Sequence, residues 1–242
     1  RMRYASKSVT GVRAQNQDAV FVPRGGEISL AVVADGMGGQ SAGDIASSLA
    51  VGAVVAELKK GGTGGAAQLV SAAMAAANAA VYEKAASDPA LRGMGTTMVL
   101  ALLFNSHYIA ANVGDSRLYH ISGEDIEQIT KDHSYVAELV ALGYITRQEA
   151  ARHPRRNLIT RALGTRESER VDIFEREWAR GDKLVLCSDG LYSELDEQDI
   201  LHTVLSSEDM QSACDDLVDC ALYSGSRDNV SIVIVSNEEA KP

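Results

Sequence analysis

The sequence predicts an α+β fold, with an antiparallel β-sandwich at its centre and helices packed outside. Short strand-like runs separated by turn residues dominate residues 96–130. Two stretches with helical periodicity precede this region, and two more follow it near the end of the chain. Strand runs and helix pairs do not alternate regularly, which argues against a doubly wound parallel sheet. Because no long linker interrupts the chain, we expect residues 1–242 to form a single domain.

The first elements that we expect are two strands within residues 18–35, joined by a turn at Pro23–Arg24–Gly25–Gly26. The second of these strands, ISLAVVAD, is continuously apolar from Leu30 up to its aspartate, which predicts burial of both faces.

Residues 41–59 change to a helical period, with one apolar stripe made by Ile45, Leu49, Val54 and Leu58. After the glycine-rich link at 61–65, a second helix is expected to run to about residue 86. Its many alanines would let it pack closely against a neighbour.

The second half of the chain begins with four short strand-like runs at 96–104, 107–115, 117–122 and 125–130, which predict a meander. Residues 132–170 are mixed and rich in arginine, and we expect residues 143–170 to form a surface insertion. The later elements are expected in the order strand 171–177, strand 183–189, helix 196–205, helix 208–223, strand 229–236 and a frayed tail from Asn237 to Pro242.

Composition excludes several classes of function. The formal net charge of −10 argues against nucleic acid or an anionic membrane as the main partner. The three cysteines form no CxxC or Cys/His cluster, so a zinc finger is not expected, and their odd, sparse number suggests a reducing compartment. No signal-peptide pattern or membrane-spanning run is visible. We therefore expect a cytoplasmic monomer.

Five aspartates adjoin apolar strand-like runs: Asp18, Asp35, Asp115, Asp189 and Asp228. A single aspartate at a strand end is usually a cap or a turn residue. Five carboxylates brought together at one edge of a sheet would repel one another unless cations were present. Oxygen ligands without histidine or cysteine indicate Mg²⁺ or Mn²⁺, and two such ions can activate a water for attack on phosphorus. Arg13 precedes Asp18 by five residues, and its planar guanidinium suits phosphate oxygens.

The chain resembles the bacterial branch of the metal-dependent type 2C (PPM) serine/threonine protein phosphatases. The segments that carry the resemblance span nearly the whole chain and are GVRAQNQD, VVADGMGG, GMGTTMVLALL, ANVGDSRLY, TKDHS, HPRRNLITRALG, LVLCSDGL and SRDNVSIVIV. The resemblance implies an αββα sandwich, a flap at residues 143–170, and hydrolysis of phosphoserine and phosphothreonine in opposition to a bacterial Ser/Thr kinase.

The resemblance also implies a role for each site residue. Asp35 would bridge two core ions, with the carbonyl of Gly36 on one of them. Asp189 and Asp228 would bind the other ion, and Asp18 would act directly or through a bound water. Asp115 would help to hold a third, weaker ion, and Arg13 would bind the substrate phosphate.

One position departs from the family pattern. Many bacterial members read DGMGGH, whereas this chain has Gln40 in place of the histidine. A glutamine cannot supply a proton to the leaving group. His153, His133 and a metal-bound water are the remaining candidates for the proton donor. We favour a structural role for His133 and expect His153 to be the general acid.

Two alternative functions are compatible with some of these features. Another phosphoryl-transfer enzyme or a nuclease is disfavoured, because the chain has no DxD, P-loop or GxSxG motif and is acidic overall. A catalytically weak or dead regulatory module of the same fold would lack ligand aspartates, and all five are present.

Overall fold

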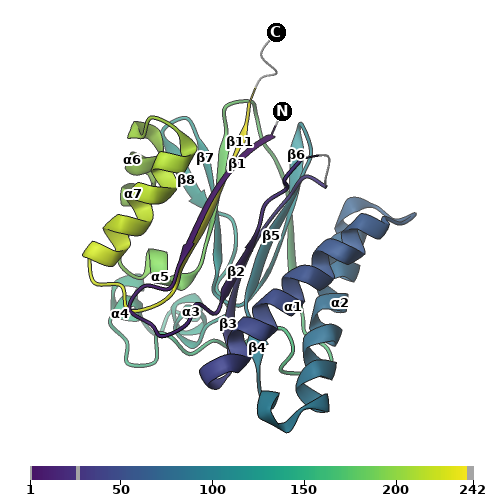
Figure 1. Ribbon diagram of the computed structural model, residues 1–242. Helices are drawn as coiled ribbons and strands as arrows, with labels where there is room; N and C mark the ends of the chain where they lie inside the picture. Colours follow the sequence, from purple (N-terminus) through teal and green to yellow (C-terminus); the bar gives the residue numbers. More distant parts are fainter. Residues whose placement is uncertain (1, 26–27, 239–242) are drawn as a thin grey trace.

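Two antiparallel sheets form the centre of the molecule (Figure 1). The computed structural model describes residues 2–25 and 28–238, apart from the side chains of Gln40 and Ser41. The first sheet has the strand order β1 (Met2–Val9), β11 (Val230–Asn237), β10 (Lys183–Cys187), β7 (Arg117–Ser122) and β8 (Asp125–Gln128). The second has the order β2 (Asp18–Phe21), β3 (Leu30–Met37), β5 (Met98–Leu103), β6 (His107–Val113) and β9 (Asp172–Glu177), with β4 (Gly95–Thr96) paired to β3.

The apolar run of β3 is buried on both faces, as its continuous hydrophobicity predicts. Ala31 and Val33 belong to the core between the two sheets, which also contains Leu184 of β10 and Val233 of β11. Leu30, Val32 and Ala34 point the other way, into the core beneath the helices of the second sheet. One sheet therefore contributes to two cores, and the predicted sandwich is confirmed.

Helices cover the outer face of each sheet (Figure 1). The second sheet is covered by α1 (Gly39–Lys60) and α2 (Ala66–Ser87), followed by the short turn η1 (Pro89–Leu91). The first is covered by α5 (Asp189–Tyr192), α6 (Glu197–Ser206) and α7 (Met210–Tyr223). Asp196 and Asp209 cap α6 and α7, which explains why these helices begin close to their predicted starts. Among the described residues, no helix is long and apolar enough to cross a membrane.

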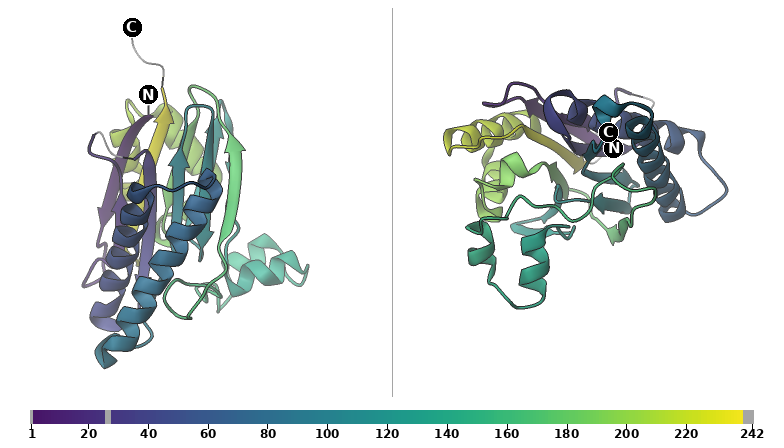
Figure 2. Two further views of the ribbon diagram at one scale, coloured as in Figure 1. Left: turned by 90° about the vertical axis from the view of Figure 1, so that its right-hand side faces the viewer. Right: turned by 90° about the horizontal axis from the view of Figure 1, so that it is seen from below.

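A helical excursion projects from the sandwich (Figure 2). It contains α3 (Tyr135–Ala141) and α4 (Arg147–Ala151), and an isolated bridge between Ser134 and Ile159 closes its base. Helix α4 and the residues that follow it belong to the segment predicted as the flap, whereas α3 precedes that segment.

The prediction of one meander over residues 96–130 is wrong. Strands β5 and β6 pair in the second sheet, but β7 and β8 pair in the first. The chain crosses between the sheets at the turn that contains Gly114, where φ is +104°. A glycine is suited to this left-handed backbone conformation.

Both ends of the chain are more ordered than the sequence predicts. Strand β1 was not predicted, and it pairs along its length with β11. Asn237 was assigned to a frayed tail, yet it ends β11 and is buried, and its amide donates to the carbonyls of Asn105 and Ala179. Residues 239–242 of that tail, and Gly26 of the predicted turn, lie outside the described residues.

Candidate metal centre

The five aspartates lie at one edge of the sandwich because of where their strands begin and end. Asp18 begins β2 and is the direct cross-strand partner of Asp35 in β3. Asp115 follows the end of β6, Asp189 follows the end of β10, and Asp228 precedes β11 by two residues. The antiparallel order of the strands carries these ends to the same edge.

Asp18 is held through one of its two oxygens. Its Oδ2 accepts hydrogen bonds from the hydroxyls of Ser188 at 2.8 Å and Ser231 at 2.6 Å. Its Oδ1 is buried and has no hydrogen-bond partner. A buried carboxylate oxygen without a hydrogen-bond partner destabilises the folded protein, so a ligand at Oδ1 of Asp18 is expected.

The backbone around Asp35 is fixed from both sides. Its N–H donates to the hydroxyl of Thr97, and its carbonyl accepts from the N–H of Thr97 and the hydroxyl of Thr96. The next residue is Gly36, where an added Cβ would lie 1.9 Å from the carbonyl oxygen of Gly43 in α1. Only glycine fits this approach of strand to helix, which explains the glycine after Asp35.

Asp115 is positioned by the turn before it and by a histidine. The N–H of Gly114 donates to Nδ1 of His133 at 3.1 Å, and the N–H of His133 donates to the carbonyl of Gly114 at 2.9 Å. The hydroxyl of Tyr192 donates to the carbonyl of Asp115. His133 therefore has the structural role expected for it.

Arg13 lies against Asp228. Its Nη2 donates to Oδ2 of Asp228 at 2.8 Å, and its Nε donates to the carbonyl of Arg227 at 2.8 Å. The loop that carries Arg13 is held by Asn229, whose amide donates to the carbonyls of Thr10 and Gln15 and accepts from the N–H of Gln17. The side chain of Arg13 remains 55% exposed, so an anion can reach it.

The electrostatics of the cluster disfavour bare carboxylates. Burial raises the pKa of Asp18 to about 6 and that of Asp115 to about 8, and repulsion from Asp189 adds to both shifts. Burial also raises the pKa of Asp189, with repulsion from Asp228 as the next cause. The pKa of Asp35 lies well above its ordinary value, because of burial and then repulsion from the other four aspartates.

These residues fit divalent cations. The donor set is all oxygen, and Oδ1 of Asp189, like that of Asp18, is buried without a partner. Within the described part of the chain, no three His, Cys, Asp or Glu side chains are arranged to hold one ion among themselves. Mg²⁺ typically takes one or two carboxylates and keeps several waters, which is consistent with this looser arrangement.

His153 lies apart from this group in its contacts. Its Nδ1 accepts from the N–H of Arg155, and its ring centroid is 5.7 Å from that of Tyr135. Both partners belong to the projecting excursion, so the structure does not bring His153 into contact with the aspartates. The side chain of Gln40 lies outside what the structure describes.

Several residues that organise the site were not singled out from the sequence. Ser188, Ser231 and Asn229 hold Asp18 or the loop of Arg13. A signal was available for two of them, because Ser188 directly precedes Asp189 and Asn229 directly follows Asp228. Ser231 has no such signal, since it contacts Asp18 only through the fold.

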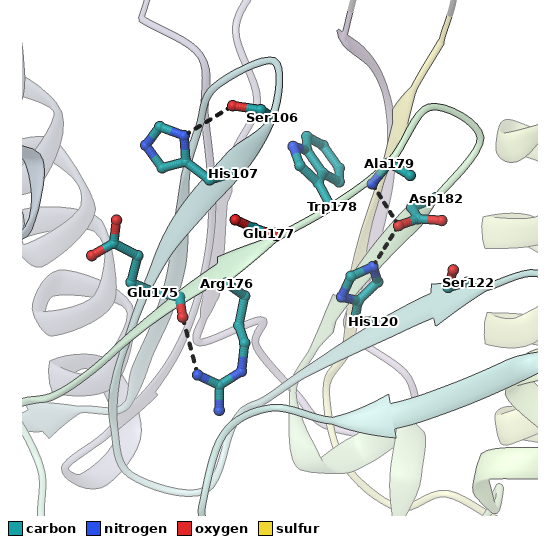
Figure 3. A pocket seen from close by; sticks show the side chains of 10 residues that line it. All are labelled: Ser106, His107, His120, Ser122, Glu175, Arg176, Glu177, Trp178, Ala179 and Asp182. Carbon is teal, nitrogen blue, oxygen red and sulfur yellow. Dashed lines mark hydrogen bonds and ion pairs between the residues drawn. The ribbon is translucent and has the colours of Figure 1, made fainter.

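A separate pocket of about 830 Å³ is lined by residues of β6, β7 and β9 and of the segment before β10 (Figure 3). His120 and Asp182 meet there, with Nε2 of the histidine 3.0 Å from Oδ2 of the aspartate. Trp178 and Arg176 also line it. None of the five aspartates takes part in this pocket.

Comparison with known sequences identifies related proteins that match most of the chain. Residues 7–222 match the family described as protein phosphatase 2C. The serine/threonine protein phosphatase PstP of Mycobacterium tuberculosis is 39% identical over 235 residues, which cover 96% of this chain and 44% of PstP. The serine/threonine phosphatase stp of Listeria monocytogenes is 34% identical, covering 94% of this chain and 92% of stp. The chain thus spans less than half of PstP but nearly all of the Listeria protein.

Solved structures agree with the fold. The crystal structure of the M. tuberculosis phosphatase PstP/Ppp superposes with a TM-score of 0.91 at 37% identity, covering 98% of this chain and 99% of that one. A crystal structure of the catalytic domain of PstP in complex with two manganese ions has a TM-score of 0.87 at 36% identity, with 97% of each chain covered. The matched segment spans most of the chain, and more than a third of the aligned residues are identical in these two relatives. The chain therefore belongs to the protein phosphatase 2C family.

Proposed function

We propose that this chain is a metal-dependent serine/threonine protein phosphatase, folded as one domain over residues 1–242. The observation that carries the proposal is the edge of five aspartates, where carboxylate oxygens of Asp18 and Asp189 are buried without partners. Family membership supports the reaction class, because curated relatives are serine/threonine protein phosphatases. Since the chain spans only 44% of PstP, the activity of a longer protein is part of the proposal.

The residues fit two core ions, which we propose to be Mn²⁺ or Mg²⁺, and a third, weaker one. Asp35 would hold both core ions, since it lies directly across the β2–β3 pair from Asp18, and burial and then repulsion from the other four aspartates raise its pKa. The Gly36 carbonyl would complete one core position, and Asp189 and Asp228 the other. Asp18 would support the core ions and Asp115 the third. When bound, such ions offset phosphate charge and make a water acidic enough to attack phosphorus near neutral pH.

Arg13 would bind the substrate phosphate. Its hydrogen bonds to Asp228 and to the Arg227 carbonyl fix the plane of the guanidinium beside the aspartates. A fixed fork of N–H donors suits two phosphate oxygens at once. A bound phosphate would replace Asp228 as the acceptor of the N–H groups of Arg13. Divalent ions at Asp228 would favour this replacement.

His153 would donate the proton that a serine or threonine alkoxide needs on leaving. Its Nδ1 accepts a hydrogen bond from the Arg155 N–H, so a neutral ring carries its proton on Nε2. The proposal requires the excursion that carries His153 to approach the aspartates when substrate is bound.

The substrates that we propose are phosphorylated proteins, including those of a bacterial Ser/Thr kinase. The test is release of phosphate from phosphoserine and phosphothreonine peptides by the purified chain, in Mn²⁺ and in excess chelator. We expect turnover with Mn²⁺ that the chelator removes. A chain that releases no phosphate from the peptides or from p-nitrophenyl phosphate in Mn²⁺ would instead be a regulatory module.

A further inference from the structure

We propose that Ser188 and Ser231 are positioning residues that orient Asp18, so that only its Oδ1 is presented to the metal centre. This inference rests on the proposed metal-dependent function and extends it to two residues to which no role has been assigned. Both serines are completely buried. Their hydroxyls donate to the same oxygen, Oδ2, at 2.8 and 2.6 Å.

The hydrogens in this network have one consistent direction. A hydroxyl has a single hydrogen, and Ser231 gives its own to Asp18. In the 2.8 Å contact between Ser8 and Ser231, Ser8 must therefore be the donor. The oxygen of Ser8 in turn accepts from Nδ2 of Asn16 at 2.9 Å. Every donor along this path thus points towards Asp18.

The network closes on itself. Oδ1 of Asn16 accepts from the backbone N–H of Asp18 at 3.1 Å, which completes a ring that starts and ends at the aspartate. Ser188 is fixed separately, because its oxygen accepts from the N–H of Ser231 and its own N–H donates to the Ser231 carbonyl. Neither serine can turn its hydroxyl away from Asp18 without breaking another contact.

The network also joins the two sheets at the metal edge. Ser8 lies in β1, Ser188 follows β10, and Ser231 lies in β11, all in the first sheet. Asp18 begins β2 in the second sheet. With Oδ2 saturated by two hydroxyls, Oδ1 is the oxygen left for a ligand, and it is the one that is buried without a partner. Outer partners of this kind typically orient metal ligands and tune their affinity.

The test compares Ser188→Ala and Ser231→Ala with Ser236→Ala. Ser236 is a matched control, since it is also a buried serine of β11 but lies at the other end of that strand. Mn²⁺ affinity is measured by calorimetric titration of chelator-treated protein, well below the melting temperature, so that a loss of stability alone does not alter it. We expect the first two variants to bind Mn²⁺ about 10- to 100-fold more weakly and the control to bind normally.

A third variant keeps the test decisive if one of these chains folds poorly. Ser8→Ala removes the donor to Ser231 but leaves both hydroxyls that touch Asp18. We expect a loss of affinity smaller than that of Ser231→Ala and larger than that of Ser236→Ala. Wild-type affinity in folded Ser188→Ala and Ser231→Ala would overturn the positioning role. If the unmodified chain bound no Mn²⁺, the metal-dependent function would itself be wrong, and this proposal with it.

Discussion

At the scale of single residues, the pKa of Asp35 is raised well above its ordinary value by burial and then by repulsion from the four other aspartates. Asp35 shares a hydrogen bond with Asp189 and stands opposite Asp18 across the β2–β3 pair. A residue in this position repels its neighbours when ions are absent and would join them when ions are bound. The same carboxylate therefore opposes stability in one state and supports it in the other.

Asp35→Asn should therefore have opposite effects on the stability of the metal-free protein and of the Mn²⁺-bound protein. The substitution removes the free-energy cost of burying the Asp35 carboxyl beside the other aspartates, so it should raise the melting temperature of chelator-treated protein. The variant should lose most of the stabilisation that Mn²⁺ gives and nearly all phosphopeptide turnover. Asp125→Asn, at an exposed position of β8, is the control and should alter neither property. Normal Mn²⁺ stabilisation of Asp35→Asn would contradict the bridging role.

Substitutions of Arg13 should have different effects from those of Asp35, because Arg13 would bind the substrate and not the ions. Loss of a charge-assisted hydrogen bond costs about 1.5–3 kcal/mol, which corresponds to roughly a ten- to hundredfold fall in kcat/KM for Arg13→Ala. Arg13→Lys keeps the charge but loses the fork, so it should recover only part of the activity. Mn²⁺ affinity should not fall in Arg13→Ala, because the guanidinium and a divalent ion would compete for Asp228. Unchanged kcat/KM on a phosphopeptide would remove Arg13 from the site.

At the scale of elements, His133 connects the base of the excursion to the turn before Asp115. Its carbonyl accepts from the N–H of Thr160, its Nδ1 accepts from Gly114, and its Nε2 lies 3.1 Å from Asp172. Because Gly114 donates to Nδ1, a neutral ring carries its hydrogen on Nε2 and donates it to Asp172. The two ring nitrogens thus make separate contacts, Nδ1 with Gly114 and Nε2 with Asp172.

Substitutions that mimic one nitrogen at a time test this arrangement. In His133→Asn the side-chain oxygen can replace Nδ1, and in His133→Gln the amide can replace Nε2. The glutamine variant leaves the buried Gly114 N–H without a partner, which costs about 1–3 kcal/mol. The asparagine variant leaves Asp172 the hydrogen bond that Nη1 of Arg161 donates to its Oδ1. His133→Gln should therefore have the lower melting temperature, by roughly 2–4 °C per kcal/mol of difference. Equal melting temperatures would show that the Gly114 contact contributes nothing.

The excursion itself is tested through His153. A serine alkoxide must be protonated as it leaves, whereas nitrophenolate leaves without help, and a general acid contributes on the order of a hundred- to ten-thousand-fold. His153→Ala should therefore cut phosphopeptide turnover severely and p-nitrophenyl phosphate turnover much less. Arg152→Ala, at the exposed residue just before it, is the control. Equal losses on both substrates would assign His153 a structural role in the excursion, through its contacts with Tyr135 and Arg155.

At the scale of the whole molecule, the sandwich and its helix pairs could be predicted because their signals are local. The run ISLAVVAD is apolar at every position from Leu30 to its aspartate, which is typical of a strand buried on both faces. The aspartates were found for the same reason, since each adjoins such a run.

What the sequence did not reveal depends on pairing between distant segments. Strand β1 alternates weakly and exposes charged residues such as Arg3, so only its pairing with β11 defines it. The sequence around Gly114 resembles that of a hairpin turn. No residue near it indicates that the next strand joins the other sheet. The Ser231 hydroxyl meets Asp18 across 213 positions of chain, a distance over which no spacing pattern operates.

The pH dependence of stability belongs to the molecule as a whole, because it sums over the aspartate cluster. Asp18 and Asp115 have pKa values of about 6 and about 8, against an ordinary 3.8. Between the ordinary pKa of 3.8 and the raised values of about 6 and about 8, these two groups hold more protons in the folded protein than in the unfolded chain. Stability of chelator-treated protein should therefore be highest at about pH 4 or below as far as these groups are concerned, and should fall as pH rises towards 8.

Divalent ions should reverse this trend, because they bind the deprotonated carboxylates and compete with protons. The rise in melting temperature that Mn²⁺ causes should then be small at pH 5 and grow steadily to pH 8. The measurement is a pair of melting curves, in chelator and in Mn²⁺, at each pH across this range. Asp35→Asn serves as the control, since its curves with and without Mn²⁺ should stay close together throughout. An Mn²⁺ increment that is the same at every pH would mean that the clustered aspartates are already ionised in the metal-free protein, and that protons and metal ions do not share them.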